Sequence, residues 1–222
     1  MSKNFLTPIV LPAGTASSAP LNLQSGTNLS AAAAGAVEYD GAVIYTTPSG
    51  RGVSPSMMFY RLNNGLTGAN TTADQSLFGV GVTLAANTVY AFELNFAMGK
   101  ASGTTSHTFG VNFGGTATVN NIFYNGTSNG SNTTLPALIL NAASVTVAST
   151  ANANIGSASS NTVFLRVFRL SGTVSINAGG TFIPQYRLSS SPGGAYSTLT
   201  GSHFAIWPIG AAGANTSVGP WA

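Results

Sequence analysis

The chain has 222 residues, and only 5% of them are charged, against about 25% in an average globular domain. Seven basic and four acidic residues are spread thinly, which disfavours a nucleic-acid interface, and the absence of cysteine excludes disulfides and thiol chemistry. The sequence contains no apolar run of about 18 residues that could span a membrane. Because little net charge keeps copies apart, we expect much of the Ser-, Thr-, Asn- and Gly-rich surface to be buried against other chains.

Residues 1–55 predict an extended N-terminal arm with a short β-hairpin. The stretch "LPAGTASSAPLNLQSG" alternates small residues with isolated apolar ones, and Asp40-Gly41 is a hairpin turn signal. The opening "MSKNFLTPIVLPAG" is interrupted by prolines, so we do not expect a signal peptide. We expect the arm to lie against the body or a partner, with docking contacts from its apolar residues Phe5, Leu6, Ile9, Leu21 and Leu23.

Residues 56–222 predict many short strands separated by Gly- and Asn-rich turns. The clearest strand is "TVYAFELNFAM", in which apolar side chains recur with a period of two and share one face: Tyr90, Phe92, Leu94, Phe96 and Met98. Helix-forming residues are scarce, and no repeat of 20 to 50 residues is present. This pattern predicts an all-β sandwich or barrel.

Few titratable residues are available for catalysis. Glu38 and Asp40 could share one face of a strand as a carboxylate pair for glycoside hydrolysis, but a turn at Asp40 and an ion pair at Glu38 explain them better. Glu93 falls on the polar face of the best strand. His107 and His203 are isolated, which favours a loop position for the first and a strand entry for the second. We therefore predict no catalytic residue, no metal site and no cofactor.

Two further segments indicate contacts with ligands or subunits. The stretch "YNGTSNGSNTT" reads as a loop that could contact sugars through Tyr124, Asn125 and Asn129. In "FLRVFRL", Arg166 and Arg169 point to opposite faces of a strand, so one of them is expected to face inward or to meet another subunit. The uncharged end of the chain, from Leu188 onward, is expected to supply part of the core and part of a subunit contact.

Three segments resemble known virion proteins. "LAANTVYAFELNFAMGKASGTTSHTFGVNFGGTATV" and "SGTVSINAGGTFIPQYRLSSSPGGAYSTLTGSHFAIWPIG" look like the C-terminal jelly-roll domain of tailed-bacteriophage virion proteins, in the general style of tumour-necrosis-factor and C1q-like trimers. The stretch "AGTASSAPLNLQSGTNLSAAAAGAVEYDGAVIYTTPSGR" is similar to a segment of phage tail-fibre proteins. The resemblance implies a jelly-roll β-sandwich over residues 56–222 and a docking arm over residues 1–55.

The resemblance also implies a function in assembly. We expect a homotrimeric fibre or decoration protein on the outer surface of a phage particle, assembled in the host cytoplasm and attached to another virion protein of the head or tail. The alternative is a lectin-like tip that recognises a host surface glycan. A polysaccharide-degrading enzyme would need Glu38, Asp40 or Glu93 in a cleft with a second carboxylate. Neither nucleic acid nor membrane is an expected partner.

Overall fold

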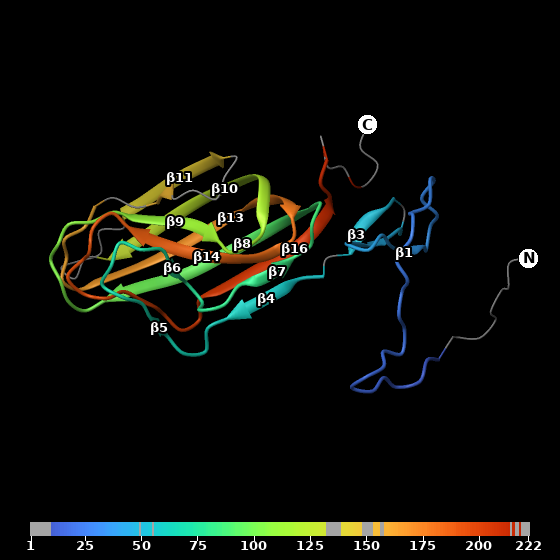
Figure 1. Ribbon diagram of the computed structural model, residues 1–222, viewed down its shortest axis with the longest axis horizontal. Helices are drawn as coiled ribbons and strands as arrows, with labels where there is room; N and C mark the ends of the chain where they lie inside the picture. Colours follow the sequence, from blue (N-terminus) through green and yellow to red (C-terminus); the bar gives the residue numbers. More distant parts are fainter. Residues whose placement is uncertain are drawn as a thin grey trace, which may run out of the picture.

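The protein is an all-β sandwich preceded by an N-terminal arm, as the sequence predicts (Figure 1). The computed structural model describes residues 10–48, 50–54, 56–131, 139–147, 153–155, 158–213, 215 and 218. The described residues form no helix, and hence none that could cross a membrane. Of the predicted arm residues, Phe5, Leu6 and Ile9 lie outside the described part of the chain.

Two antiparallel sheets make up the sandwich. The larger sheet contains β4 (Met58–Arg61), β5 (Leu66–Thr67), β8 (Thr88–Lys100), β10 (Thr118–Ser131), β11 (Ile139–Val147), β13 (Phe164–Ala178), β15 (Ser197–Thr198) and β16 (His203–Ala211). The smaller sheet contains β6 (Gln75–Ser76), β7 (Val82–Leu84), β9 (Phe109–Gly114), β12 (Ala153–Asn154) and β14 (Gly180–Leu188).

The chain passes repeatedly from one sheet to the other. Successive strands lie in opposite sheets from β7 to β10 and from β11 to β15, whereas the pairs β4–β5, β6–β7, β10–β11 and β15–β16 each stay in one sheet. Apart from β10 and β11, strands that pair within these two sheets are not neighbours in sequence. The order in the larger sheet is β4-β16-β8-β13-β10-β11, and in the smaller sheet β14 lies between β9 and β6. This wrapping is the jelly-roll arrangement that the resemblance implies.

The core lies between the sheets, and β8 shows why. Its inward side chains from Tyr90 to Met98 are each at most 4% exposed, which confirms the period of two in the sequence. β8 pairs with β13 over twelve consecutive residue pairs, and this register sets Phe96 opposite Phe168. The two rings stack with centroids 4.7 Å apart, and Phe168 stacks in turn on Phe109 of the smaller sheet at 4.8 Å. One aromatic column therefore joins the two sheets.

Residues 124–131 of the segment expected to be a loop at "YNGTSNGSNTT" belong instead to β10, so that expectation is wrong for them, and residues 132–134 lie outside the described residues. β10 pairs with β13 and β11, and Tyr124, Gly126 and Ser128 face inward and are buried. Gly126 fits there because a β-carbon at this position would lie 3.3 Å from Cγ of Leu170. Because its inward positions hold small residues, this stretch forms a strand, although its Asn-Gly pairs are typical of turns.

The arm ends in a sheet of its own, formed by β1 (Val37–Tyr39), β2 (Ile44–Thr46) and β3 (Gly52–Ser54). Figure 1 draws this small sheet outside the sandwich, near the end at which β4 begins. Asp40 closes the β1–β2 turn by accepting hydrogen bonds from the backbone N–H groups of Ala42 and Val43 at 2.9 and 2.8 Å. Gly41 supplies the positive φ of 99° that this turn requires.

The aromatic column makes Phe168 a sensitive position. We expect Phe168→Ala to lower the free energy of unfolding by roughly 3–5 kcal/mol, because it removes a fully buried ring and leaves a cavity between two stacked partners. Denaturant unfolding measures the change. The control Val163→Ala lies just before β13, where 49% of the residue is exposed, and should change stability by less than about 1 kcal/mol. Equal effects would contradict the packing described here.

Candidate functional site

The outer face of the larger sheet carries a row of polar side chains. The strand registers place five residues side by side on consecutive strands, in the order Arg61 (β4), His203 (β16), Asn95 (β8), Arg169 (β13) and Thr127 (β10). This row crosses five strands of one sheet. We call it, together with the row beside it, the outer sheet face.

The second row runs parallel to the first, two residues along each strand. It consists of Phe59 (β4), Ala205 (β16), Glu93 (β8), Ser171 (β13) and Asn125 (β10). Glu93 and Arg169 are exposed, and within the described part of the chain neither has an ion-pair partner. Both charges are therefore available to a partner.

His203 is held in one orientation between Arg61 and Asn95 in the first row. Its Nδ1 lies 3.2 Å from the carbonyl oxygen of Gly201, and its Nε2 lies 3.3 Å from the amide nitrogen of Asn95. A carbonyl only accepts, so Nδ1 carries the proton and Nε2 accepts from Asn95. The ring of Phe59 stacks on the imidazole at a centroid distance of 5.5 Å. The arrangement gives a flat surface of rings and amides.

Apolar side chains flank the polar rows. Four large ones remain well exposed on this side: Phe59 at 57%, Leu165 at 46%, Val167 at 39% and Phe123 at 39%. Two shallow hollows also lie on the face and share Asn95 and Arg169 in their linings. A mostly flat, partly apolar sheet face with few charges is the kind of surface that other protein chains cover.

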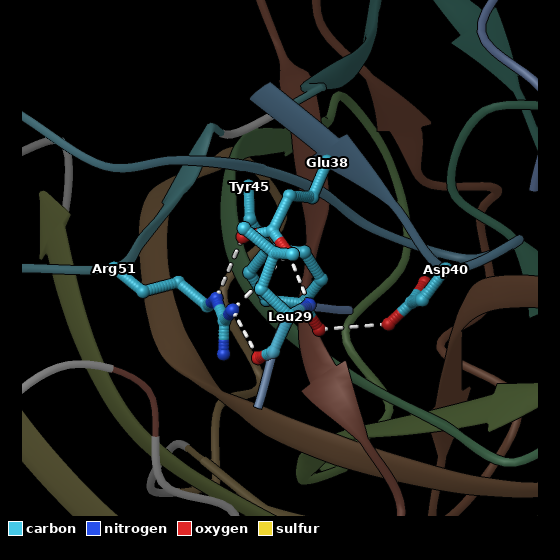
Figure 2. A network of polar contacts seen from close by, with 5 residues as sticks. All are labelled: Leu29, Glu38, Asp40, Tyr45 and Arg51. Atoms are coloured by element: carbon cyan, nitrogen blue, oxygen red, sulfur yellow. Dashed lines mark hydrogen bonds and ion pairs between the residues drawn. The ribbon is translucent and has the colours of Figure 1, made fainter. Parts of the chain in front are cut away.

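The arm provides a second surface, which the network in Figure 2 holds together. Arg51 donates from Nε to Glu38 at 2.9 Å and from an Nη to the carbonyl oxygen of Leu29 at 2.7 Å. Glu38 in turn accepts the backbone N–H of Leu29 at 2.6 Å. This hydrogen bond and the neighbouring Arg51 cation lower the pKa of Glu38. The segment before β1 is thus fixed to the three-stranded sheet.

Asp40 and Tyr45 complete the network on the other side of the hairpin. Burial alone would raise the pKa of Asp40, but hydrogen bonds from the N–H groups of Val43 and Ala42 and from the Tyr45 hydroxyl lower it. Burial and the bond to Asp40 raise the pKa of Tyr45 to about 12. Glu38 and Asp40 therefore have structural roles, which is the interpretation that the sequence favoured. Both carboxylates form hydrogen bonds with other residues of the arm.

Several apolar side chains of the arm are exposed to solvent, although Val43 and Tyr45 are buried. Large exposed fractions belong to Val10 (89%), Leu11 (46%), Leu21 (62%), Leu29 (48%) and Val37 (57%). Leu23, the other predicted docking residue within the described part of the chain, is partly buried. Of these residues, Leu29 and Val37 belong to the part of the arm that the polar network holds, whereas Val10, Leu11 and Leu21 lie in the segment that precedes it.

The predicted sugar-contact residues do not lie together at a loop tip. Tyr124 is only 1% exposed, and its ring packs against Phe92 and Phe113, so its assignment as a sugar platform is wrong. Asn129 is partly buried. Asn125 is exposed and belongs to the second row of the outer sheet face. Of the three residues, Asn125 alone occupies a place at which a ligand could reach it.

The remaining catalytic candidates are dispersed. His203 begins β16, as predicted, and His107 lies between β8 and β9, as predicted, but it is buried, with 3% of the residue exposed. Its Nδ1 lies 2.7 Å from the carbonyl oxygen of Thr105, and its Nε2 lies 2.7 Å from the hydroxyl of Tyr196. Among the described residues, no three His, Asp or Glu side chains gather in a group that could hold a metal ion.

The outer sheet face was only partly visible in the sequence. Glu93 and Asn95 stand at alternate positions of a strand whose other face is fully apolar, and this alternation marks the exposed side. Arg61 and His203 are 142 positions apart in the chain and adjacent in the sheet, and nothing in their local sequence indicates this.

Comparisons with models of protein families, with curated proteins and with solved structures gave no match.

Removing the Glu38 charge tests the arm network. We expect Glu38→Gln to accelerate hydrogen exchange at the Leu29 amide by roughly two- to fivefold, in line with the modest strength of exposed ion pairs, because a neutral amide accepts more weakly and Arg51 loses its ion pair. Exchange followed by mass spectrometry on peptides covering residues 26–30 measures it. Asp74→Asn, which removes the exposed contact to Arg187 at 4.0 Å, should leave this exchange unchanged. Unaltered protection in Glu38→Gln would contradict the network.

His107 should make stability depend on pH. Burial lowers the pKa of His107, so between the unfolded value of 6.5 and the lower folded value the unfolded chain binds the proton more readily. Stability is therefore complete above pH 6.5 and declines below it, by at most about 1.4 kcal/mol per pH unit. Denaturant unfolding from pH 7.5 to 5 measures the decline. His107→Gln should flatten it, and His203→Gln, which retains His107, should keep it. A decline that survives His107→Gln would have another source.

Proposed function

We propose that the protein is a non-enzymatic structural component of a virion, a homotrimeric fibre or decoration protein that docks on another virion protein through its N-terminal arm. The observation that carries this proposal is the arm itself. Its small sheet is held by an ion pair and hydrogen bonds, and Leu29 and Val37 expose apolar surface on it, as Leu21 does in the segment that precedes it. A rigid framework with exposed apolar side chains suits a docking element, since its ordering cost is already met before binding.

We propose that the copies in the trimer associate through the outer sheet face. This face exposes Leu165, Val167 and Phe123 beside two rows in which Arg61, Glu93 and Arg169 are charged and the other seven residues are neutral. In a chain with 5% charged residues, burial between copies would remove the surface that otherwise promotes non-specific association. Further copies of this chain are the occupants that we propose for the face.

The assignment to a tailed-phage particle is supported by the sequence resemblance and by the wrapping of the chain. Two of the segments that resemble phage virion proteins run from residue 84 to 119 and from 171 to 210, and they contain β8, β9, β14 and β15 together with the second half of β13 and most of β16. The proposal covers a location on the particle surface and a partner in the head or tail. It involves no turnover of substrate.

Two reciprocal variants test the two surfaces. Val167→Glu adds a charge to the outer sheet face and should convert the trimer to monomer, because three like charges would be buried together. Leu21→Glu changes only the arm and should keep the trimer mass while reducing incorporation into particles by about tenfold or more, the effect of losing one buried apolar anchor. Light scattering gives the mass, and mass spectrometry of purified particles gives the incorporation.

Either surface can fail separately. A monomeric wild-type protein would contradict self-association, and full incorporation of Leu21→Glu together with Leu11→Glu would contradict docking through the arm. Circular dichroism of each variant confirms that the sandwich is intact.

A second candidate function is recognition of a host surface glycan by the same face. Glu93, Asn95, Asn125 and Arg169 line a hollow with planar polar groups that suit sugar hydroxyls. Copies packed on this face would cover the hollow, so trimer formation through the face and sugar binding exclude each other. A glycan array probed with wild type and with Asn125→Ala distinguishes them, since binding that depends on Asn125 requires an uncovered face.

A further inference from the structure

Two cations interrupt the apolar interior at one end of the sandwich. The inward positions of β8 end with Met98 and Lys100, and those of β13 begin with Phe164 and Arg166. The register sets Lys100 opposite Phe164 and Arg166 opposite Met98. Lys100 is 6% exposed and Arg166 is 3% exposed, so both side chains are enclosed.

Tyr196 lies close to Lys100, Phe164 and His107. Its ring lies 5.8 Å from Nζ of Lys100 and 5.7 Å from the ring of Phe164, and the guanidinium of Arg166 lies 4.8 Å from that same Phe164 ring. The hydroxyl of Tyr196 lies 2.7 Å from Nε2 of His107. We call Lys100, Arg166, His107 and Tyr196 the interior basic cluster.

His107 adds no positive charge to the cluster at neutral pH. Its Nδ1 faces the carbonyl oxygen of Thr105 and so carries the proton, which leaves Nε2 to accept the hydroxyl of Tyr196. Burial and then the nearby cations Lys100 and Arg166 lower the pKa of His107. The charge of the cluster therefore comes from Lys100 and Arg166.

No carboxylate side chain of the chain neutralises these two cations. The sequence has four acidic residues, and each has a place elsewhere: Glu38 on Arg51, Asp40 in the β1–β2 turn, Asp74 beside Arg187 and Glu93 on the outer sheet face. Buried charges without a counter-charge carry a penalty of several kcal/mol. The rings of Phe164 and Tyr196 offset only part of it.

Donor groups in the cluster also lack acceptors. Nε of Arg166 is buried without a hydrogen-bond partner, and Lys100 donates one of its three hydrogens, to the carbonyl oxygen of Gly103 at 2.7 Å. An unpaired buried donor is costly and rare in folded proteins. The missing component is thus an acceptor with negative charge.

We propose that the interior basic cluster binds a small inorganic monovalent anion, of the size and charge of chloride, between Arg166 and Lys100. The enclosure of both side chains limits the ligand to a small ion. One negative charge would neutralise one cation and accept from Nε of Arg166. Because it binds only the folded protein, the anion would stabilise the fold in proportion to its occupancy. The site is independent of the arm and of the outer sheet face.

Thermal unfolding in matched salts tests the site. The wild-type chain is compared in sodium chloride and in sodium gluconate at equal ionic strength, because gluconate is too large to be enclosed. We expect chloride to raise the Tm relative to gluconate, with a folding constant that grows about tenfold for each tenfold rise in chloride above its Kd. Arg166→Met should lose this difference. Arg169→Met, which removes a cation three residues away on the outer face, should retain it.

A direct measurement covers the case in which Arg166→Met does not fold. The ³⁵Cl NMR line of a chloride solution should broaden in the presence of the folded wild-type protein, and bromide should reverse the broadening by competition. Crystals grown in bromide should show anomalous scattering beside Arg166 and Lys100. The proposal is overturned if wild type shows equal Tm values in both salts and no broadening, or if Arg169→Met abolishes the chloride effect while Arg166→Met keeps it.

Discussion

The ladder between β8 and β13 is the constraint on which the rest of the structure depends. Its twelve residue pairs set Phe96 against Phe168 inside the sandwich and Asn95 beside Arg169 outside it. Because side chains alternate between the two faces, a slip by one residue would exchange core and surface along the whole strand. The aromatic column, the outer sheet face and the interior basic cluster are thus consequences of one register.

Scarcity of charge gives each charged side chain a distinct position. Arg51 and Glu38 hold the arm, Arg169 and Glu93 lie on the outer sheet face without an ion pair to any described residue, and Lys100 and Arg166 lie inside the sandwich. Because the chain has few charged groups that could form ion pairs, hydrophobic burial and hydrogen bonds between neutral groups contribute most of the favourable free energy of folding. The isolated charges then mark the places at which an external partner or ion would have the largest electrostatic effect.

Local pattern predicted the strands well where it was strong and failed where it was ambiguous. The alternation from Tyr90 to Met98 identified a half-buried strand, and the opposite directions of Arg166 and Arg169 followed from their odd spacing. In β10, Asn125-Gly126 and Asn129-Gly130 read as turns, and yet the strand continues through both. Gly126 is inward because Leu170 fills the space beside it, and this contact comes from another strand. Residues typical of turns therefore gave a wrong prediction at Gly126, where the side chain of Leu170 on the neighbouring strand fills the space beside the glycine.

The sequence by itself determined that the chain is all-β, that it carries few charges and that Tyr90 to Met98 form a buried face, because composition and a period of two are local properties. Only the tertiary structure decided which distant residues meet. It set Arg61 beside His203, buried Tyr124 in the core, and enclosed Lys100 and Arg166 around Tyr196 without a carboxylate. The reason is that strand order and register arise from contacts between segments far apart in the chain, and such contacts leave no mark on the local pattern of either segment.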